Sequence, residues 1–288
     1  MFTRCTFFTL VLATTSMAGP ASAENLQGFA SGFTSRSIDP PESGVPLLQS
    51  FYFRYTDSDH HLRAIDIEPN APSVNEARIG YADENGDDQF FYNIDLQRYS
   101  GRIFQQTHGR EVCTGRCTKT ILAPADRENH VFVIRGFYIF FHGDDHHIDQ
   151  IGIQEDDGQV TVSFNDQDDN DTFLWDLHYA YIPRSRVADI GARSGNARGA
   201  QRVSIRSGPA VIRGFNFDFT SKDHHIKDIG IQMTGNGQLS VFYGDREPDD
   251  SFAWQVRYAI TRPARASIYE EAIPTPLSWL ESAMSGRP

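Results

Sequence analysis

Three Asp-His-His triplets have the clearest capacity for chemistry in this sequence. They contain six of its ten histidines. Carboxylates bind hard cations, and neutral imidazole binds softer metals or exchanges a proton near neutral pH. The triplets are Asp59-His60-His61, Asp145-His146-His147 and Asp223-His224-His225.

A pair of aspartates, five residues apart, follows each triplet. If hairpins bring each pair close to its triplet, every copy gathers ligands for calcium or another divalent cation. No loop has the Asp-x-Asp-x-Asp-Gly pattern with a distal Glu that EF-hands carry. We therefore predict three binding sites, and a metal would use the same Asp and His groups. The pairs are Asp83 and Asp88, Asp166 and Asp171, and Asp245 and Asp250.

A structural role explains the same triplets without a ligand. Adjacent residues on a strand point to opposite faces, so only one His of each triplet can face a site. The Asp would then cap a turn, and one imidazole would pack or form a hydrogen bond beneath it. Both interpretations remain open at this point.

The triplets belong to a longer repeated unit. Phe137-Tyr-Ile-Phe-Phe141 and Phe215-Asn-Phe-Asp-Phe219 lie 78 residues apart, and an Ile-Gly-Ile-Gln block follows each at the same offset. Phe51, Phe53 and Tyr55 begin a more divergent first copy. Large apolar residues alternate in all these blocks, which predicts half-buried strands.

The repeated strands predict an all-β fold. We expect three tandem repeats of a small antiparallel β-sandwich, with a single threefold β-barrel as the alternative, and a short C-terminal helix at 275–284. The expected segments are a signal peptide at 1–23, repeats at 24–105, 106–183 and 184–266, and a C-terminal tail at 267–288.

The N-terminus has the pattern of a secretory signal. Arg4 precedes an apolar stretch, and Ala21-Ser-Ala23 fits a cleavage site. We expect cleavage near Ala23 and a secreted or periplasmic protein. No segment is long and apolar enough to span a membrane. In an oxidising compartment Cys113 and Cys117 should form a local disulfide.

The net charge of the chain indicates which kinds of partner it could bind. The formal net charge is −12, so a nucleic-acid partner is not expected. Residues 184–213 differ from the rest, with seven arginines and the single acid Asp189. We expect an Arg/Gly-rich linker at the start of the third repeat, which either folds onto acidic loops of the chain or binds an anionic glycan or cell surface.

The parity of the aromatic residues separates core from surface. Phe137, Ile139 and Phe141 share one face, which predicts a core. Tyr138, Phe140 and Tyr181 have the opposite parity and are the candidates for an exposed aromatic surface.

The order of the strands resembles the H-type lectin domain, a six-stranded sandwich. An Arg-Gly-Phe strand, an Ile-x-Ile strand, a Val-x-Val-x-Phe strand and a closing Phe-x-Trp-x-Leu-x-Tyr-Ala strand carry the resemblance over Phe137–Ala180. The third copy follows the same order over Phe215–Ala259, with Leu239, Tyr243 and Val256 in place of Val, Phe and Leu. The resemblance implies binding of galactose or N-acetylgalactosamine and assembly into trimers. It does not include the Asp-His-His triplets.

The leading functional hypothesis is an exported binding protein that recognises a glycan, or another cell-surface or matrix component, multivalently. Three equivalent copies suit repeated binding better than catalysis, which needs one asymmetric constellation. Association of several chains into a homo-oligomer fits the same hypothesis. The alternatives are a metal-dependent secreted hydrolase that uses the Asp and His clusters, and a structural envelope or matrix protein.

Overall fold

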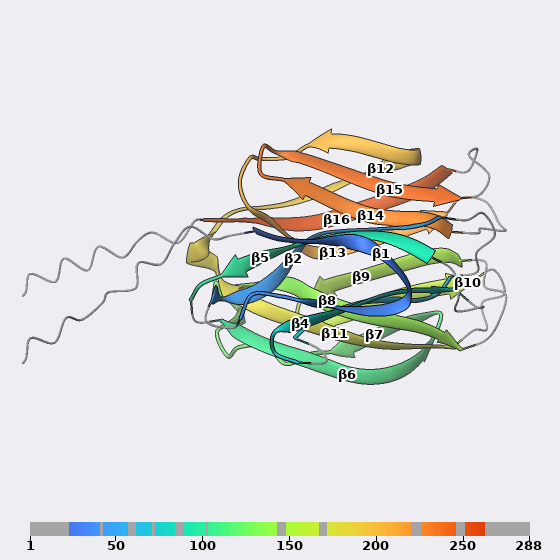
Figure 1. Ribbon diagram of the computed structural model, residues 1–288. Helices are drawn as coiled ribbons and strands as arrows, with labels where there is room; N and C mark the ends of the chain where they lie inside the picture. The colour runs from blue at the N-terminus through green and yellow to red at the C-terminus, as the bar shows by residue number, and fades with distance from the viewer. Residues whose placement is uncertain are drawn as a thin grey trace, which may run out of the picture. The chain divides into compact units, whose positions relative to one another are not determined.

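The described part of the chain forms sixteen antiparallel strands (Figure 1). The computed structural model describes residues 23–40, 43–56, 62–70, 73–83, 89–101, 103–142, 148–166, 172–219, 226–245 and 251–262. Two 3-10 turns, Arg127–Asn129 and Arg184–Arg186, interrupt the strands. The strands are β1 (Ala23–Ser37), β2 (Val45–Tyr55), β3 (Leu62–Pro69), β4 (Glu76–Asp83), β5 (Gln89–Tyr99), β6 (Phe104–Thr114), β7 (Arg116–Thr120), β8 (His130–His142), β9 (Ile148–Asp156), β10 (Gln159–Asp166), β11 (Thr172–Pro183), β12 (Val187–Ser204), β13 (Ala210–Phe219), β14 (Ile226–Thr234), β15 (Gln238–Asp245) and β16 (Ser251–Thr261).

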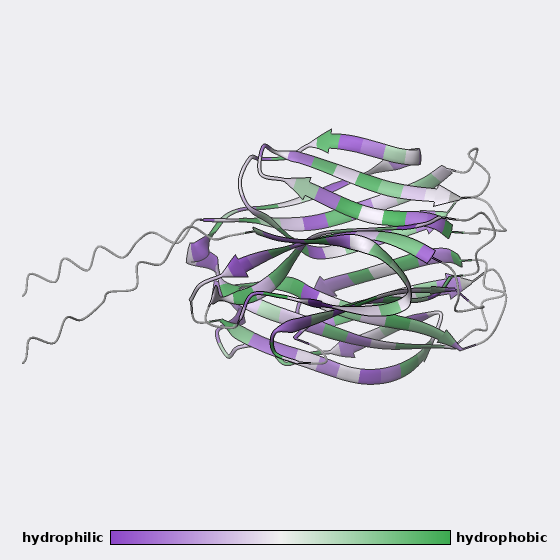
Figure 2. Cartoon of the chain, in the orientation of Figure 1, coloured by the Kyte–Doolittle hydropathy of each residue, from purple (hydrophilic) through white to green (hydrophobic). Residues whose placement is uncertain are grey.

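Alternating side chains give most strands one buried and one more accessible face. In β16, for example, Phe252, Trp254 and Val256 are buried, whereas the residues between them are partly exposed. Apolar and polar residues accordingly alternate along the strands in Figure 2. The all-β prediction from this two-residue period is confirmed.

The strands form three six-stranded sheets, named here sheets A, B and C. Each sheet joins three strands of one sequence segment to three of another through the pairs β2–β14, β8–β3 and β13–β9. The segments are therefore not separate sandwiches in a row, and the continuous pairing agrees with the single threefold alternative. The strand orders are β1-β5-β2-β14-β15-β12 for sheet A, β6-β11-β8-β3-β4-β1 for sheet B and β12-β16-β13-β9-β10-β7 for sheet C.

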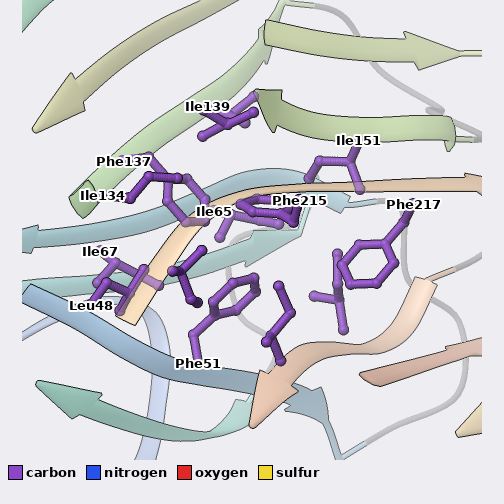
Figure 3. Packing of buried hydrophobic residues seen from close by; sticks show 14 of the residues in the cluster. Leu48, Phe51, Ile65, Ile67, Ile134, Phe137, Ile139, Ile151, Phe215 and Phe217 are labelled. Atoms are coloured by element: carbon purple, nitrogen blue, oxygen red, sulfur yellow. The ribbon is translucent and has the colours of Figure 1, made fainter. Parts of the chain in front are cut away.

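The larger of the two buried apolar clusters is shared by all three segments. Phe51, Phe137 and Phe215 occupy the same place in their copies, and their ring centroids are 5.4 to 5.6 Å apart in all three pairings. Figure 3 shows these rings among isoleucines that come from several strands. All three rings are fully buried, so each segment completes the core of the others.

Three glycines allow the chain to pass from one sheet to the next. β1 pairs with β5 before Gly32 and with β4 after it, and β12 changes partner in the same way at Gly199. Gly115 separates β6 from β7 at the corresponding point. Their φ angles are +61°, +61° and +67° for Gly32, Gly115 and Gly199, which side chains disfavour.

We expect Gly199→Ala to lower the free energy of unfolding by about 1 kcal/mol, because the new side chain has space but the left-handed backbone is strained. Urea denaturation measures the loss. Gly109→Ala is the matched control, since Gly109 also has free space but no positive φ. Equal stability of Gly199→Ala and the wild type would contradict the role of this glycine.

The predicted disulfide joins Cys113 to Cys117, with their Cα atoms 6.0 Å apart. The bridge spans Gly115 and so links the end of β6, in sheet B, to β7, in sheet C. The indole Nε1 of Trp175 donates a hydrogen bond to Cys113 Sγ at 3.2 Å. The bridge closes a short loop, so its entropic contribution is modest, and its structural effect is to fix this crossing between sheets.

Other sequence predictions have different outcomes. The Arg/Gly-rich stretch that we expected to be a linker is a strand, since residues 187–204 form β12 and pair with two strands. Two of its glycines, Gly191 and Gly195, leave room for the side chains of Tyr258 and Trp254 on the neighbouring strand. The signal peptide expected at 1–23, apart from Ala23 at the start of β1, and the helix expected at 275–284 lie outside the described residues. Within the described ranges, no helix is long and apolar enough to cross a membrane.

Candidate functional site

Nearly all of the predicted site residues fall outside the part of the chain that the structure describes. Asp83 is described, and it ends β4 as a buried residue. Asp166 and Asp245 end β10 and β15, and only their backbone is described. The expected approach of each triplet to its aspartate pair therefore stays a prediction. Outside the described residues lie Asp59, His60, His61, Asp88, Asp145, His146, His147, Asp171, Asp223, His224, His225 and Asp250.

The outer face of sheet A carries a hollow of about 400 Å³ that aromatic side chains line. Phe29 on β1 and Phe91 on β5 are opposite each other in the ladder, and Arg54 on β2 is opposite Phe91 on its other side. Phe29 is 58% exposed, which is unusual for a large apolar side chain. We call this feature the aromatic hollow. Its lining residues are Phe29, Tyr52, Arg54, Tyr55, Thr56 and Phe91.

The rings of the aromatic hollow form a continuous row. Phe29 meets Phe91 edge to face with centroids 5.3 Å apart, and Phe91 lies 6.2 Å from Tyr52. Tyr52 continues the row to Phe242 on β15, at 5.0 Å. Edge-to-face and tilted pairs at these distances are favourable, so the rings hold one another in place.

A glycine makes room for Tyr52. Gly230 on β14 is opposite Tyr52, and a Cβ there would lie 2.9 Å from Tyr52 Cδ2. Because β14 has no side chain at this point, the tyrosine ring leans across the strand and reaches Phe242. The Ile-Gly-Ile sequence of β14 thus serves the outer face of sheet A as well as the core.

Charged groups flank the rings. Arg54 is opposite Asp228 of β14, and burial raises the pKa of that carboxyl, while the positive charge of Arg54 opposes the rise. Burial, followed by the charge of Asp228, raises the pKa of the Tyr52 hydroxyl, which therefore stays protonated and can donate a hydrogen bond at neutral pH. The aromatic hollow offers apolar faces together with guanidinium and hydroxyl donors.

The aromatic hollow is not reproduced at the corresponding positions of the other two sheets. Sheet B has Val112, Leu174 and Phe140 in the row that holds Phe29, Phe91 and Arg54 in sheet A, and sheet C has Asn196, Ala253 and Asp218. The internal copies share their core positions but differ on their outer faces. The internal repeat therefore does not predict an equivalent aromatic hollow on the outer faces of sheets B and C.

The predicted exposed aromatics lie elsewhere, on sheet B and its flank. Tyr138 and Phe140 are half-buried, since Arg78 covers the first ring and Arg63 the second, with guanidinium-to-centroid distances of 5.4 and 5.2 Å. Tyr181 is buried, so its place among the exposed candidates is wrong. Tyr181 follows Tyr179 by two residues and Trp175 by six, so it has the parity of the buried face of β11, and the nearby register shift inserts its extra residue in β8.

Tyr52 and Phe91, which our sequence prediction missed, did leave a signal. Each lies at the outward parity of its strand, between core residues such as Phe51 and Phe53 or Phe90 and Tyr92. The sequence could not indicate that two distant strands place these rings side by side.

The arginines of the 184–213 segment lie mostly on the surface. Arg193 donates to the Ser204 carbonyl at 3.2 Å, and Arg206 donates to the Ala188 carbonyl at 3.3 Å. Arg202 donates to the Ser240 hydroxyl at 3.4 Å. Within the described ranges, these three arginines thus donate to uncharged oxygen atoms of the same chain. Their contact with acidic loops stays a prediction.

Comparison with known proteins does not identify a family. No family model and no curated protein matches the chain. The resemblance to H-type lectins therefore stays a sequence-based expectation, and the geometry of the aromatic hollow carries the functional argument.

Proposed function

We propose that this chain is an exported glycan-binding protein whose sugar site is the aromatic hollow of sheet A. The observation that carries the proposal is the row of Phe29, Phe91 and Tyr52 beside Arg54. A pyranose ring has an apolar face of C–H groups and a rim of hydroxyls. The apolar face of the sugar can stack on exposed aromatic rings, and its hydroxyls can accept hydrogen bonds from guanidinium and phenol groups.

The size and composition of the aromatic hollow support the proposal. Small-ligand sites have volumes of roughly 300 to 1,000 Å³ and combine apolar walls with a few converging polar groups. The volume of about 400 Å³ suits one or two sugar residues. The N-terminal signal pattern and the similarity of strand order to H-type lectins favour a glycan of a cell surface or matrix as the ligand.

One aromatic hollow per chain changes how multivalency would arise. Since sheets B and C lack the same residues, binding at several points would depend on association of several chains or on the loops that carry the Asp-His-His triplets. We propose the homo-oligomer as the simpler source of avidity.

We expect the full mature protein to bind defined members of a glycan array, and Tyr52→Ala to weaken that binding about tenfold, or 1.4 kcal/mol. The reason is the loss of both the ring that continues the row and its hydroxyl donor. Isothermal titration with the best array ligand measures the change.

Tyr138→Ala is the matched control, because Tyr138 occupies the corresponding position in sheet B beneath Arg78. It should leave glycan affinity unchanged. The absence of any glycan ligand, or equal loss in both variants, would exclude the aromatic hollow as a sugar site.

A further inference from the structure

A second group of polar side chains lies on the outer face of sheet B. Glu68 comes from β3, and Asp176 and His178 come from β11, with β8 between them. Glu68 and Asp176 are each 6% exposed, so two carboxyl groups are largely removed from water. We call these three residues the Glu-Asp-His cluster.

A glycine allows these side chains to meet across a strand. Gly136 of β8 is opposite His178, and a Cβ at this position would collide with the backbone of Ile67, next to Glu68. With no side chain there, Glu68 Oε1 comes within 3.5 Å of His178 Nε2. One ligand atom from each member of the Glu-Asp-His cluster lies within 4.8 Å of the others.

Neighbouring groups orient the members of the cluster. Thr107 Oγ1 lies 3.1 Å from His178 Nδ1, and Arg78 bonds the other Glu68 oxygen, Oε2, at 2.8 Å. When Nδ1–H donates to the threonine, the lone pair of Nε2 faces Glu68 Oε1 and can bind a cation; without a cation, Nε2–H donates to Glu68 instead. Asp176 Oδ1 is buried and has no hydrogen-bond partner among the described residues. The hydrogen bond between Asp176 and Glu68 requires a proton, and a cation between the converging oxygens takes the place of that proton.

We propose that the Glu-Asp-His cluster binds a zinc ion. Zinc takes imidazole nitrogen and carboxylate oxygen ligands, and three protein ligands leave its fourth tetrahedral position for water. The hydrogen bond from the second imidazole nitrogen to Thr107 is the outer contact that orients a metal-bound histidine. His178 is 17% exposed, so water and the ion can reach the cluster from its side.

The other two sheets show what these positions hold without a metal. In sheet C the corresponding residues are Gln154, Gln255 and Arg257, and the two amides form a hydrogen bond of 2.7 Å. In sheet A they are Gln232, Asn93 and Asp95. An amide pair forms its hydrogen bond without a titratable proton or an ion, whereas two adjacent carboxyl groups require one or the other between them. The three metal ligands thus occur together in sheet B.

Isothermal titration of the chelator-treated full mature protein with zinc chloride tests the proposal, with metal analysis for stoichiometry. We expect His178→Gln and Asp176→Asn each to lose one zinc equivalent or to weaken it at least about 100-fold. Thr107→Val should weaken the same equivalent about tenfold, because it removes only the orienting contact.

Two controls separate this site from others. Arg257→Gln changes the position of sheet C that corresponds to His178. The double variant His146→Gln, His147→Gln changes one Asp-His-His triplet. Both variants should still bind the zinc equivalent assigned to the Glu-Asp-His cluster. Thermal unfolding in chelator checks that every variant folds. Unchanged zinc binding in His178→Gln and Asp176→Asn, or its loss only in the triplet variant, would overturn the proposal.

Discussion

Phe137→Ala is expected to lower the free energy of unfolding by about 3 to 5 kcal/mol, the usual cost of truncating a buried phenylalanine. Phe137 is fully buried and contacts Phe51 and Phe215, so the cavity would lie where all three segments meet. Urea denaturation, followed by tryptophan fluorescence and by circular dichroism, measures the loss.

The same experiment tests whether the three segments form one cooperative unit. Since the cavity weakens all of them, both signals should shift together in a single transition. Phe29→Ala removes an exposed ring and should change the free energy of unfolding by less than about 0.5 kcal/mol. If only part of the signal moved in Phe137→Ala, the segments would unfold independently and the shared core would be refuted.

The core could be predicted because its signal is local. Alternation along a strand decides which residues are buried, and Phe137, Ile139 and Phe141 are buried as their parity predicted. The arrangement of the segments could not be chosen in this way. Pairs such as β2–β14 join residues far apart in sequence, for example Phe51 and Ile231, which are 180 positions apart, and either arrangement would bury the same faces.

The two candidate sites were hidden for a related reason. The aromatic hollow and the Glu-Asp-His cluster each combine strands that are distant in sequence, and their residues lie at outward positions where the repeated copies differ. His178 stands outside the three triplets that drew attention to histidine. The cluster could have been found by comparing the outward positions of the three copies. Glu68 corresponds to Gln154 and His178 to Arg257, so these positions change in charge and metal-binding capacity, whereas the buried positions stay apolar.

The linker prediction failed for a different physical reason. Glycine and arginine are common in linkers, yet the burial of residues 187–204 alternates between half-buried and exposed positions over much of β12. An edge position explains this composition, since β12 forms an edge of sheet A and of sheet C. Exposed arginines on an edge strand oppose pairing with another chain.

In the metal-free protein, Asp176→Asn is expected to raise the free energy of unfolding by about 2 kcal/mol more at pH 8 than at pH 4.5. Burial, followed by the negative charge of Glu68, raises the pKa of the Asp176 carboxyl from 3.8 to about 7. The folded protein therefore holds this proton more tightly than the unfolded chain does. Its contribution to the free energy of unfolding is present at low pH and falls as pH rises from about 4 to 7.

The neighbouring charges set the size of this effect. Arg78 and Arg110 attract the ionised form of Asp176, and the surrounding structure relaxes around the charge, so we expect about half of the roughly 4 kcal/mol that a shift of three pKa units would give. Although burial of Glu68 acts in the opposite direction, its hydrogen bond with His178 and the charge of Arg78 hold its pKa below the usual value. Protonation of Glu68, which would lower the free energy of unfolding, therefore occurs only below about pH 4.5, outside the tested range.

An amide at position 176 has a precedent in the fold, because Asn93 and Gln255 occupy the corresponding positions of sheets A and C. Urea denaturation in chelator between pH 4.5 and 8 measures the difference, and Asp156→Asn, on the exposed end of β9, controls for the loss of one negative charge. A constant difference between Asp176→Asn and the wild type across this range would mean that the buried carboxyl does not hold a proton, and the stability cost assigned to it would be wrong. A difference that grows with pH would show that sheet B keeps this acid at the expense of stability, as residues retained for binding commonly are.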